Sequence, residues 1–78
     1  MTDMKPDMVL DATGMNCPLP VLKTKKALEG LKPGQFLLVR ATDRGSMTDI
    51  PALLTRLGHG LLEVRDQGDL ILFYIVKK

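Results

Sequence analysis

The spacing of hydrophobic and polar positions changes several times along the 78-residue chain, and each change marks the border of an expected element. Short apolar or alternating runs predict strands, whereas an apolar stripe that repeats every three or four positions predicts a helix. The expected elements, in order, are a strand over 8–12; a helix from Pro18 or Pro20 to about Leu31, with Val21, Thr24, Ala27, Leu28 and Leu31 on one face; a strand over 35–42; a helix with the stripe Ile50, Leu53, Leu54 and Leu57 that stops at Gly58; and strands over 61–65 and 70–76.

This order, βαβαββ, predicts an α/β two-layer sandwich. Each strand–helix–strand unit needs a right-handed crossover, and placing both helices on one face of the sheet makes the strands advance in one direction. The last strand is apolar on both faces, which favours an interior position and a mixed four-stranded sheet of order 1-2-4-3. The uncovered face would carry Phe36, Leu38, Leu72 and Tyr74, either as a partner or dimer surface or as ordinary exposed apolar area.

The length, charge and composition of the chain exclude several classes of function. A chain of 78 residues buries about 60% of its unfolded surface, so we expect one domain over 7–78 after a flexible tail over 1–6. A net charge of +2 and an aromatic content of 4% disfavour direct binding of nucleic acid. The apolar runs are too short to span a membrane, and the first residues lack the apolar segment of a signal peptide. These features predict a reducing, cytoplasmic location.

The chemistry centres on the only cysteine, in the motif Cys17-Pro18-Leu19-Pro20. A helix is expected to begin directly after it, and a helix N-terminus favours a negative charge and lowers the pKa of a thiol. The N–H groups of Leu19 and Val21 would point at the sulfur. The two prolines suit the first helical turn, and we expect them to fix the approach of the sulfur rather than to stabilise the core.

A lone cysteine can instead pack as a small apolar side chain. Here the preceding segment over 14–16 is a glycine-led loop, which favours exposure of Cys17. One cysteine cannot form an internal disulfide, and the chain has too few cysteines and histidines for a zinc site. We therefore expect a nucleophilic thiol, with no metal and no cofactor.

The loop over 43–49 follows the second strand, so it should share the carboxyl edge of the parallel strands with Cys17. Arg44 is within plausible reach of the sulfur, where its charge would stabilise a thiolate or persulfide, although a solvated loop arginine is equally consistent with the pattern. Asp43 is expected to shape the loop through bonds from its side chain to the backbone. His59 should lie at the opposite edge, beside the last helical carbonyls, which argues against a Cys–His dyad.

The start of the second helix resembles a capping box over Ser46-Met47-Thr48-Asp49. Asp49 is also within plausible reach of Cys17, but capping explains it better, with Thr48 as an alternative cap. Pro51 then requires the helix to start late.

The first helix carries a basic cluster of Lys23, Lys25 and Lys26. Helical projection places Leu22 outside the buried stripe, near Lys23 and Lys26. An apolar side chain ringed by lysines is consistent with a docking patch for a partner protein, and equally with a solvated helix face.

The stretch LDATGMNCPLP over 10–20, the block DRGSMTDIP over 43–51, and Gly58-His59 resemble the TusA/SirA family of small sulfur carriers. The resemblance covers about residues 8–76 and implies the same sheet order. It further implies that Cys17 takes a sulfane sulfur, as a transient persulfide, from a cysteine desulfurase or rhodanese and relays it to an acceptor protein. Known destinations are tRNA thiolation, molybdenum-cofactor metabolism and sulfur oxidation. Arg44 departs from the family pattern, in which proline is common at this position.

Two hypotheses from different classes follow. In the first, the chain is a persulfide sulfurtransferase that works as a relay carrier rather than as a stand-alone enzyme. In the second, it is a noncatalytic interaction or RNA-contacting module that uses its basic first helix. The first hypothesis explains Cys17 and both prolines, whereas the second explains only the lysines.

Overall fold

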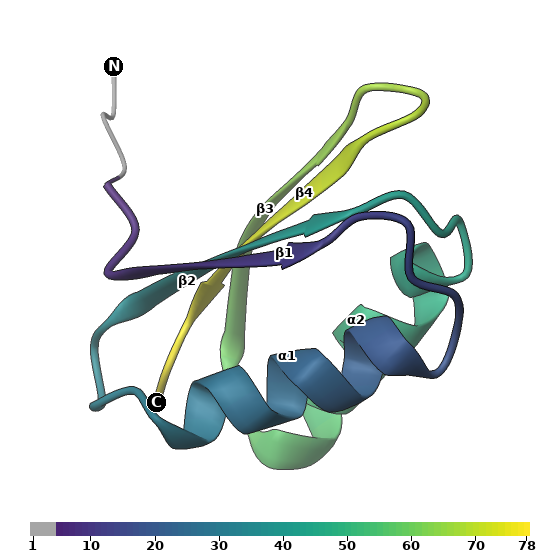
Figure 1. Ribbon diagram of the computed structural model, residues 1–78. Coiled ribbons are helices and arrows are strands. Elements are labelled where there is room, and N and C mark those ends of the chain that lie inside the picture. Colours follow the sequence, from purple (N-terminus) through teal and green to yellow (C-terminus); the bar gives the residue numbers. More distant parts are fainter. Residues whose placement is uncertain (1–4) are drawn as a thin grey trace.

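A computed structural model describes residues 5–78 and contains the predicted βαβαββ order (Figure 1). The predicted tail over 1–6 lies outside the described residues at its first four positions. The elements are β1 (Met8–Ala12), α1 (Leu19–Glu29), β2 (Phe36–Ala41), α2 (Ser46–Leu57), β3 (Gly60–Asp66) and β4 (Ile71–Val76).

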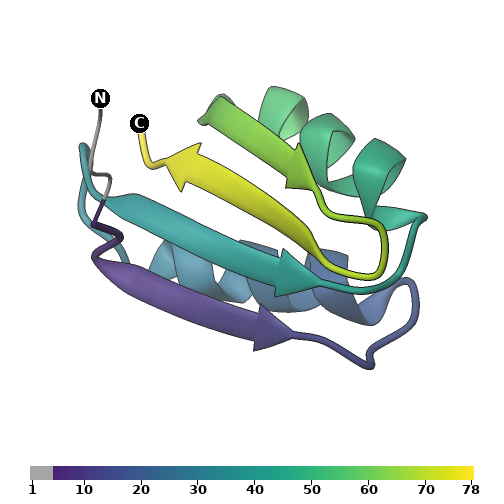
Figure 2. The ribbon, with the colours of Figure 1, turned by 90° about the horizontal axis from the view of Figure 1, so that it is seen from above.

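The four strands form one mixed sheet in the predicted order β1-β2-β4-β3. Strands β1 and β2 pair in parallel, and β4 pairs antiparallel with both β2 and β3 (Figure 2). Both helices lie on the same side of this sheet, so the structure is the expected two-layer sandwich (Figure 1). The interior position of β4 agrees with its apolar character, because an interior strand buries more of both faces than an edge strand.

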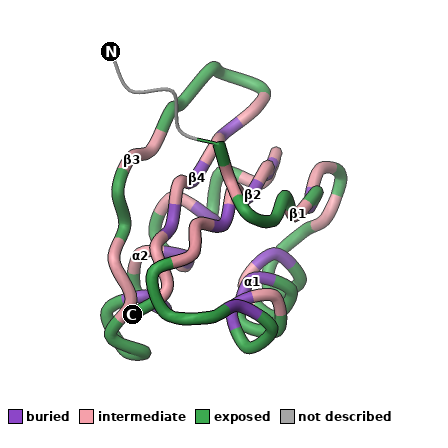
Figure 3. Tube along the Cα trace, turned by 90° about the vertical axis from the view of Figure 1, so that its left-hand side faces the viewer, coloured by how far each residue is buried: buried purple, intermediate pink, exposed green. Residues whose placement is uncertain are grey.

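The core lies between the sheet and the helices (Figure 3). Burial alternates along β2 and β4, as a strand with one covered face requires. On the uncovered face, the positions predicted from the sequence are half-buried, and the Arg65 guanidinium lies 5.4 Å from the centre of the Tyr74 ring. The buried core consists of Ala12, Leu28, Leu31, Leu37, Val39, Ala41, Ile50, Leu54, Ile71, Phe73 and Ile75.

Helix α1 buries the predicted face. Thr24 and Leu28 are buried, and Val21 and Ala27 pack against the core. Thr24 donates its hydroxyl hydrogen to the carbonyl of Pro20 over 2.7 Å, which satisfies a polar group inside the protein. The helix begins at Leu19, between the two starting points that the sequence suggested.

Helix α2 starts earlier than predicted and has no side-chain cap, so the expected caps at Ser46 and Thr48 are wrong. Backbone carbonyls replace the cap: the N–H groups of Ser46 and Met47 donate to Asp43 and Arg44 over 3.0 and 3.1 Å. Because this tight turn satisfies the first donors, the helix does not depend on a capping oxygen.

The predicted late start of α2 is also wrong, since Pro51 lies inside the helix. The end of the helix is as predicted, because Gly58 adopts a left-handed conformation with φ of 80° and its N–H donates to Leu54 over 2.8 Å. Leu57, placed in the buried stripe by its spacing, is 39% exposed. None of the helices within residues 5–78 has the length and apolar character needed to cross a bilayer.

Strand register decides which loops meet. Ala12 pairs with Ala41, Ala41 with Ile71, and Ile71 with Asp66, so the loops after β1 and β2 and the β3–β4 hairpin share one edge (Figure 2). Gly60, at the start of β3, pairs with Val76 at the other edge. The structure therefore separates His59 from Cys17, as predicted.

Candidate functional site

Cys17 is an exposed free thiol in the loop between β1 and α1. Gly14 turns this loop with a positive φ of 78°, which favours glycine, and its N–H donates to the Thr42 hydroxyl over 2.8 Å. Thr13 bonds to the Asp11 carboxylate through both its N–H and its hydroxyl, which lowers the pKa of Asp11. Local bonds thus order the segment that carries the cysteine, and the alternative of a buried apolar cysteine is wrong.

Asp43 connects the cysteine loop to the loop after β2. Its Oδ2 accepts the N–H of Cys17 over 2.8 Å, and its Oδ1 accepts the N–H of Gly45 over 3.2 Å. The predicted role of Asp43 in shaping its own loop is confirmed. The bond to Cys17 is an additional finding, and it makes Asp43 a residue that positions the cysteine backbone.

The start of α1 differs from the expected anion-binding arrangement. Pro18 occupies the N-cap position, the Cys17–Pro18 peptide is cis, and Leu19 is the first helical residue. The N–H of Leu19 donates to the carbonyl of Asn16 over 2.9 Å and is therefore unavailable to sulfur. Among residues 5–78, no backbone N–H donates a hydrogen bond to Sγ of Cys17. The predicted bonds from the N–H groups of Leu19 and Val21 to the sulfur are therefore not formed.

Asp49 contacts the sulfur directly. The thiol of Cys17 donates a hydrogen bond to Oδ2 of Asp49 over 3.0 Å. This bond raises the pKa of Cys17, and partial desolvation and the negative charges of Asp49 and Asp43 raise it further. The predicted lowering of this pKa is wrong, because the hydrogen bond to Asp49 holds the proton on sulfur, and desolvation and the two carboxylate charges add to this effect. The predicted capping role of Asp49 is also wrong, although its place in the first turn of α2 is confirmed.

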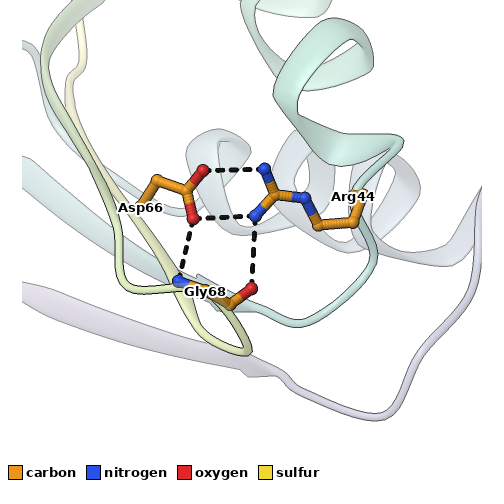
Figure 4. Close-up of polar contacts among 3 residues, drawn as sticks. All are labelled: Arg44, Asp66 and Gly68. Carbon is orange, nitrogen blue, oxygen red and sulfur yellow. Dashed lines mark hydrogen bonds and ion pairs between the residues drawn. The ribbon is translucent and has the colours of Figure 1, made fainter.

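Arg44 binds the β3–β4 hairpin rather than the sulfur, contrary to its predicted place in a persulfide environment. Its guanidinium forms two bonds of 2.7 Å to the Asp66 carboxylate and one of 3.2 Å to the Gly68 carbonyl (Figure 4). These bonds and the N–H of Gly68 lower the pKa of Asp66 to about 2. The planar guanidinium of Arg44 matches the geometry of a carboxylate, so it binds Asp66 on the hairpin with two parallel hydrogen bonds. Arg44 therefore ties the loop before α2 to the β3–β4 hairpin.

Pro20 is fully buried in the first turn of α1. The expectation that both prolines act only on the approach of the sulfur is therefore wrong for Pro20, which also fills the core. Pro18 is exposed beside the thiol.

An open groove of about 220 Å³ lies between the two helices, with Cys17 in its wall. Its lining is mostly apolar, with one carboxylate and one guanidinium on the α2 side. Arg56 was not among the site residues predicted from the sequence. Its spacing could have indicated it, because Ala52, Leu53 and Arg56 follow Asp49 by three, four and seven positions and therefore share one helical face with it. The lining residues are Cys17, Pro18 and Val21 on one side and Asp49, Ala52, Leu53 and Arg56 on the other.

The predicted docking residues lie on the outer side of α1. Leu22 is 56% exposed, in agreement with its placement outside the buried stripe, and Lys23 and Lys26 are exposed. Leu19, which also follows the cysteine, is 47% exposed.

His59 accepts the N–H of Lys78 at Nδ1 over 3.1 Å, while its own backbone N–H donates to Leu54. The predicted contact of His59 with the last helical carbonyls is therefore confirmed for its backbone N–H, whereas its imidazole bonds to Lys78. Burial, and secondarily the charge of Lys77, lower the pKa of His59. Within residues 5–78, no three His, Cys, Asp or Glu side chains gather closely enough to hold a metal ion.

Together, the fold and site define a small α/β domain that presents one thiol at the carboxyl edge of its parallel strands. The family model described as Sulfurtransferase TusA matches residues 8–77, and the chain belongs to the TusA family, whose relatives are named as sulfur carrier proteins.

Curated relatives match nearly the full length. A putative sulfur carrier protein of Bacillus subtilis, YrkI, is 50% identical over 74 residues, which cover 95% of this chain and 99% of the relative. The sulfur carrier protein TusA of Pseudomonas putida is 45% identical over 78 residues, covering 100% of this chain and 98% of the relative. The crystal structure of a SirA-like protein from Desulfitobacterium hafniense matches with a TM-score of 0.78 and 28% identity, covering 88% of this chain and 95% of the other.

Proposed function

We propose that Cys17 carries one sulfane sulfur as a persulfide between a donor protein and an acceptor protein. The observation that carries this proposal is the exposed thiol of Cys17 on an ordered loop, at the wall of an open groove. Membership of a family of sulfur carriers supports it.

Loading exchanges one S–S bond for another. The Cys17 thiol loses its proton, and the resulting thiolate attacks the outer sulfur of a donor persulfide. The S–S bond of the donor breaks, and the donor leaves as a thiolate that takes up a proton. Overall, Cys17–SH and R–S–SH become Cys17–S–SH and R–SH, with no change in total electrons. Delivery repeats the exchange, with an acceptor thiolate attacking the outer sulfur on Cys17.

The contact with Asp49 suits a carrier that rests between partners. A protonated thiol is a poor nucleophile and a poor target for oxidation, so a thiol with a raised pKa is protected while the protein is free. A docked donor that supplies a positive charge near Asp49, or displaces its carboxylate, would release the thiolate.

The donor is expected to be a cysteine desulfurase or a rhodanese-like protein, and the acceptor a protein of tRNA thiolation, molybdenum-cofactor metabolism or another sulfur-transfer route. The exposed set of Leu22, Lys23 and Lys26 is the proposed docking patch. The persulfide is a covalent intermediate, and the proposal requires no resident cofactor or metal. A reducing cytoplasm would keep Cys17 available as a thiol.

The test is sulfur transfer followed by intact-protein mass spectrometry. The purified native protein is incubated with a persulfide-bearing donor, and a gain of one sulfur is expected. Cys17→Ser should keep the fold, as seen by circular dichroism, and should gain no sulfur. Persulfide formation in Cys17→Ser, which has no other cysteine, would contradict the proposal.

A further inference from the structure

We infer that the groove between α1 and α2 binds the outer sulfur of a Cys17 persulfide, with Arg56 as the counter-cation. This inference rests on the proposed function and names the part of the protein that receives the transferred atom. It assigns a role to Arg56, which faces the same groove as the cysteine.

Loading changes the interaction between Cys17 and Asp49. In the resting state, the thiol hydrogen bonds to Oδ2 of Asp49 over 3.0 Å. In a persulfide, Sγ carries the second sulfur instead of a hydrogen, so this bond cannot form. A persulfide is also a stronger acid than a thiol, so its outer sulfur is largely anionic at neutral pH. The Asp49 carboxylate therefore attracts the unloaded side chain and repels the loaded one.

The groove has room for the outer sulfur on the side of Cys17 that the Asp49 carboxylate does not occupy, although Asp49 also lines the groove. An S–S bond is about 2 Å long, so the outer sulfur stays close to Sγ. The groove of about 220 Å³ is several times the space that one water takes in the liquid, about 30 Å³. Its walls beside Cys17 include Pro18, Val21 and Leu53, whose apolar groups suit a large, polarizable sulfur atom.

Arg56 is the cation in the groove lining. It lies seven residues after Asp49, almost two full turns along α2, so the two side chains project from nearly the same face about 10 Å apart along the helix axis. Helical side chains lean toward the N-terminus, and along α2 that direction runs from Arg56 toward Asp49. In the part of the chain from 5 to 78, no carboxylate lies within ion-pair distance of Arg56, in contrast to Arg44.

The charged groups around the sulfur therefore have opposite effects. Asp49 and Asp43 both act against a negative charge on Cys17. Arg56 lines the same groove, and its positive charge favours a negative charge on the outer sulfur there. The arrangement favours the protonated thiol before loading and the ionised persulfide after loading.

The test compares the persulfide in the wild type with that in Arg56→Ala, Arg56→Lys and the charge-matched control Arg44→Ala. Each protein is loaded with inorganic polysulfide, whose outer sulfur passes to the Cys17 thiolate while a shorter polysulfide leaves. The loaded proteins then react with an alkylating reagent over a pH series from 4 to 8. Mass spectrometry separates the alkylated persulfide from the alkylated thiol by one sulfur, and circular dichroism checks the fold of each variant.

The expected result is that Arg56→Ala slows alkylation of the persulfide about threefold at mildly acidic pH, because less of it is ionised, and that Arg56→Lys restores most of the rate. Arg44→Ala should match the wild type, since Arg44 is paired with Asp66 on the hairpin. Equal rates in Arg56→Ala and the wild type, or the same loss in Arg44→Ala, would overturn the inference. A wild type that gains no sulfur would overturn the proposed function as well. A wild type that gains sulfur but reacts at the same rate as Arg56→Ala would overturn only the role of Arg56.

Discussion

The thiol of Cys17 donates a hydrogen bond to Oδ2 of Asp49 over 3.0 Å, joining the loop before α1 to the first turn of α2. A carboxylate at this position favours the proton on sulfur. The free protein therefore holds its thiol in the less reactive form, and the proposed function then requires a partner to change the surroundings of Asp49.

Replacing Asp49 with asparagine should increase the reactivity of Cys17. The carboxylate raises the pKa of the thiol, so its loss should lower that pKa and increase the thiolate fraction at pH 7. We expect alkylation by iodoacetamide to become severalfold faster, with the largest gain below the pKa of the wild-type thiol and little gain well above it. Asp69→Asn, on the hairpin turn, is the matched control and should react like the wild type. An unchanged rate in Asp49→Asn would show that the carboxylate does not control the thiol.

The ion pair between Arg44 and Asp66 should make stability depend on acid pH. The pKa of Asp66 is lowered from 3.8 to about 2 in the folded protein, so its ionised form stabilises the fold. This contribution is present above pH 3.8 and is lost as the pH falls toward 2. Asp66→Asn should therefore lower the Tm at pH 7, and the difference from the wild type should shrink between pH 4 and 2.

The control for this pH dependence is Asp69→Asn, which removes a carboxylate from the same hairpin. It should show no comparable gap in Tm at pH 7. A gap for Asp66→Asn that stays constant down to pH 2 would mean that the substitution acts through packing instead of charge.

Pro20→Ala should reduce stability as well as transfer. The Pro20 ring is fully buried, and removing about two methylene groups from a packed site costs about 1–2 kcal/mol. A loss of this size should lower the Tm of so small a domain by roughly 4–15 °C. Pro33→Ala, in the exposed turn after α1, is the control and should change the Tm less. Thermal denaturation followed by circular dichroism measures the Tm of both variants. An unchanged Tm in Pro20→Ala would show that the buried ring does not contribute to the stability of the fold.

The sequence predicted the fold well because the fold depends on features that are local or periodic. The continuous apolar run of β4 predicts an interior strand, and the apolar stripe in α1 identifies a helix and its buried face. Gly58 marks the end of α2 because a left-handed residue is needed there. Leu57 was misplaced because spacing along a helix does not show where the covering sheet ends.

The site was predicted less completely because side-chain contacts depend on neighbours that are distant in sequence. Arg44 lies at the same edge of the molecule as Cys17, as expected, but strand order also brings Asp66 to that edge, and the Asp66 carboxylate binds Arg44. The bond from Cys17 to Asp49 spans 32 positions in the chain. Sequence alone located both residues in the right region and could not decide which groups would pair.

The last prediction concerns the docking patch of Leu22, Lys23 and Lys26. A donor must bring its own sulfur to within bonding distance of Cys17, so its binding surface has to include residues beside the thiol, and Leu22 is an exposed apolar side chain close to it in sequence. Leu22→Asp buries a charge in such an interface and Lys26→Glu reverses one, so each should weaken affinity for a cysteine desulfurase or rhodanese-like donor by about tenfold. Alkylation of Cys17 by small reagents should stay unchanged in both. Isothermal titration calorimetry with the donor measures the affinity. Unchanged binding in both variants would move the interface elsewhere, and the uncovered sheet face around Leu38 and Tyr74 would be the next surface to test.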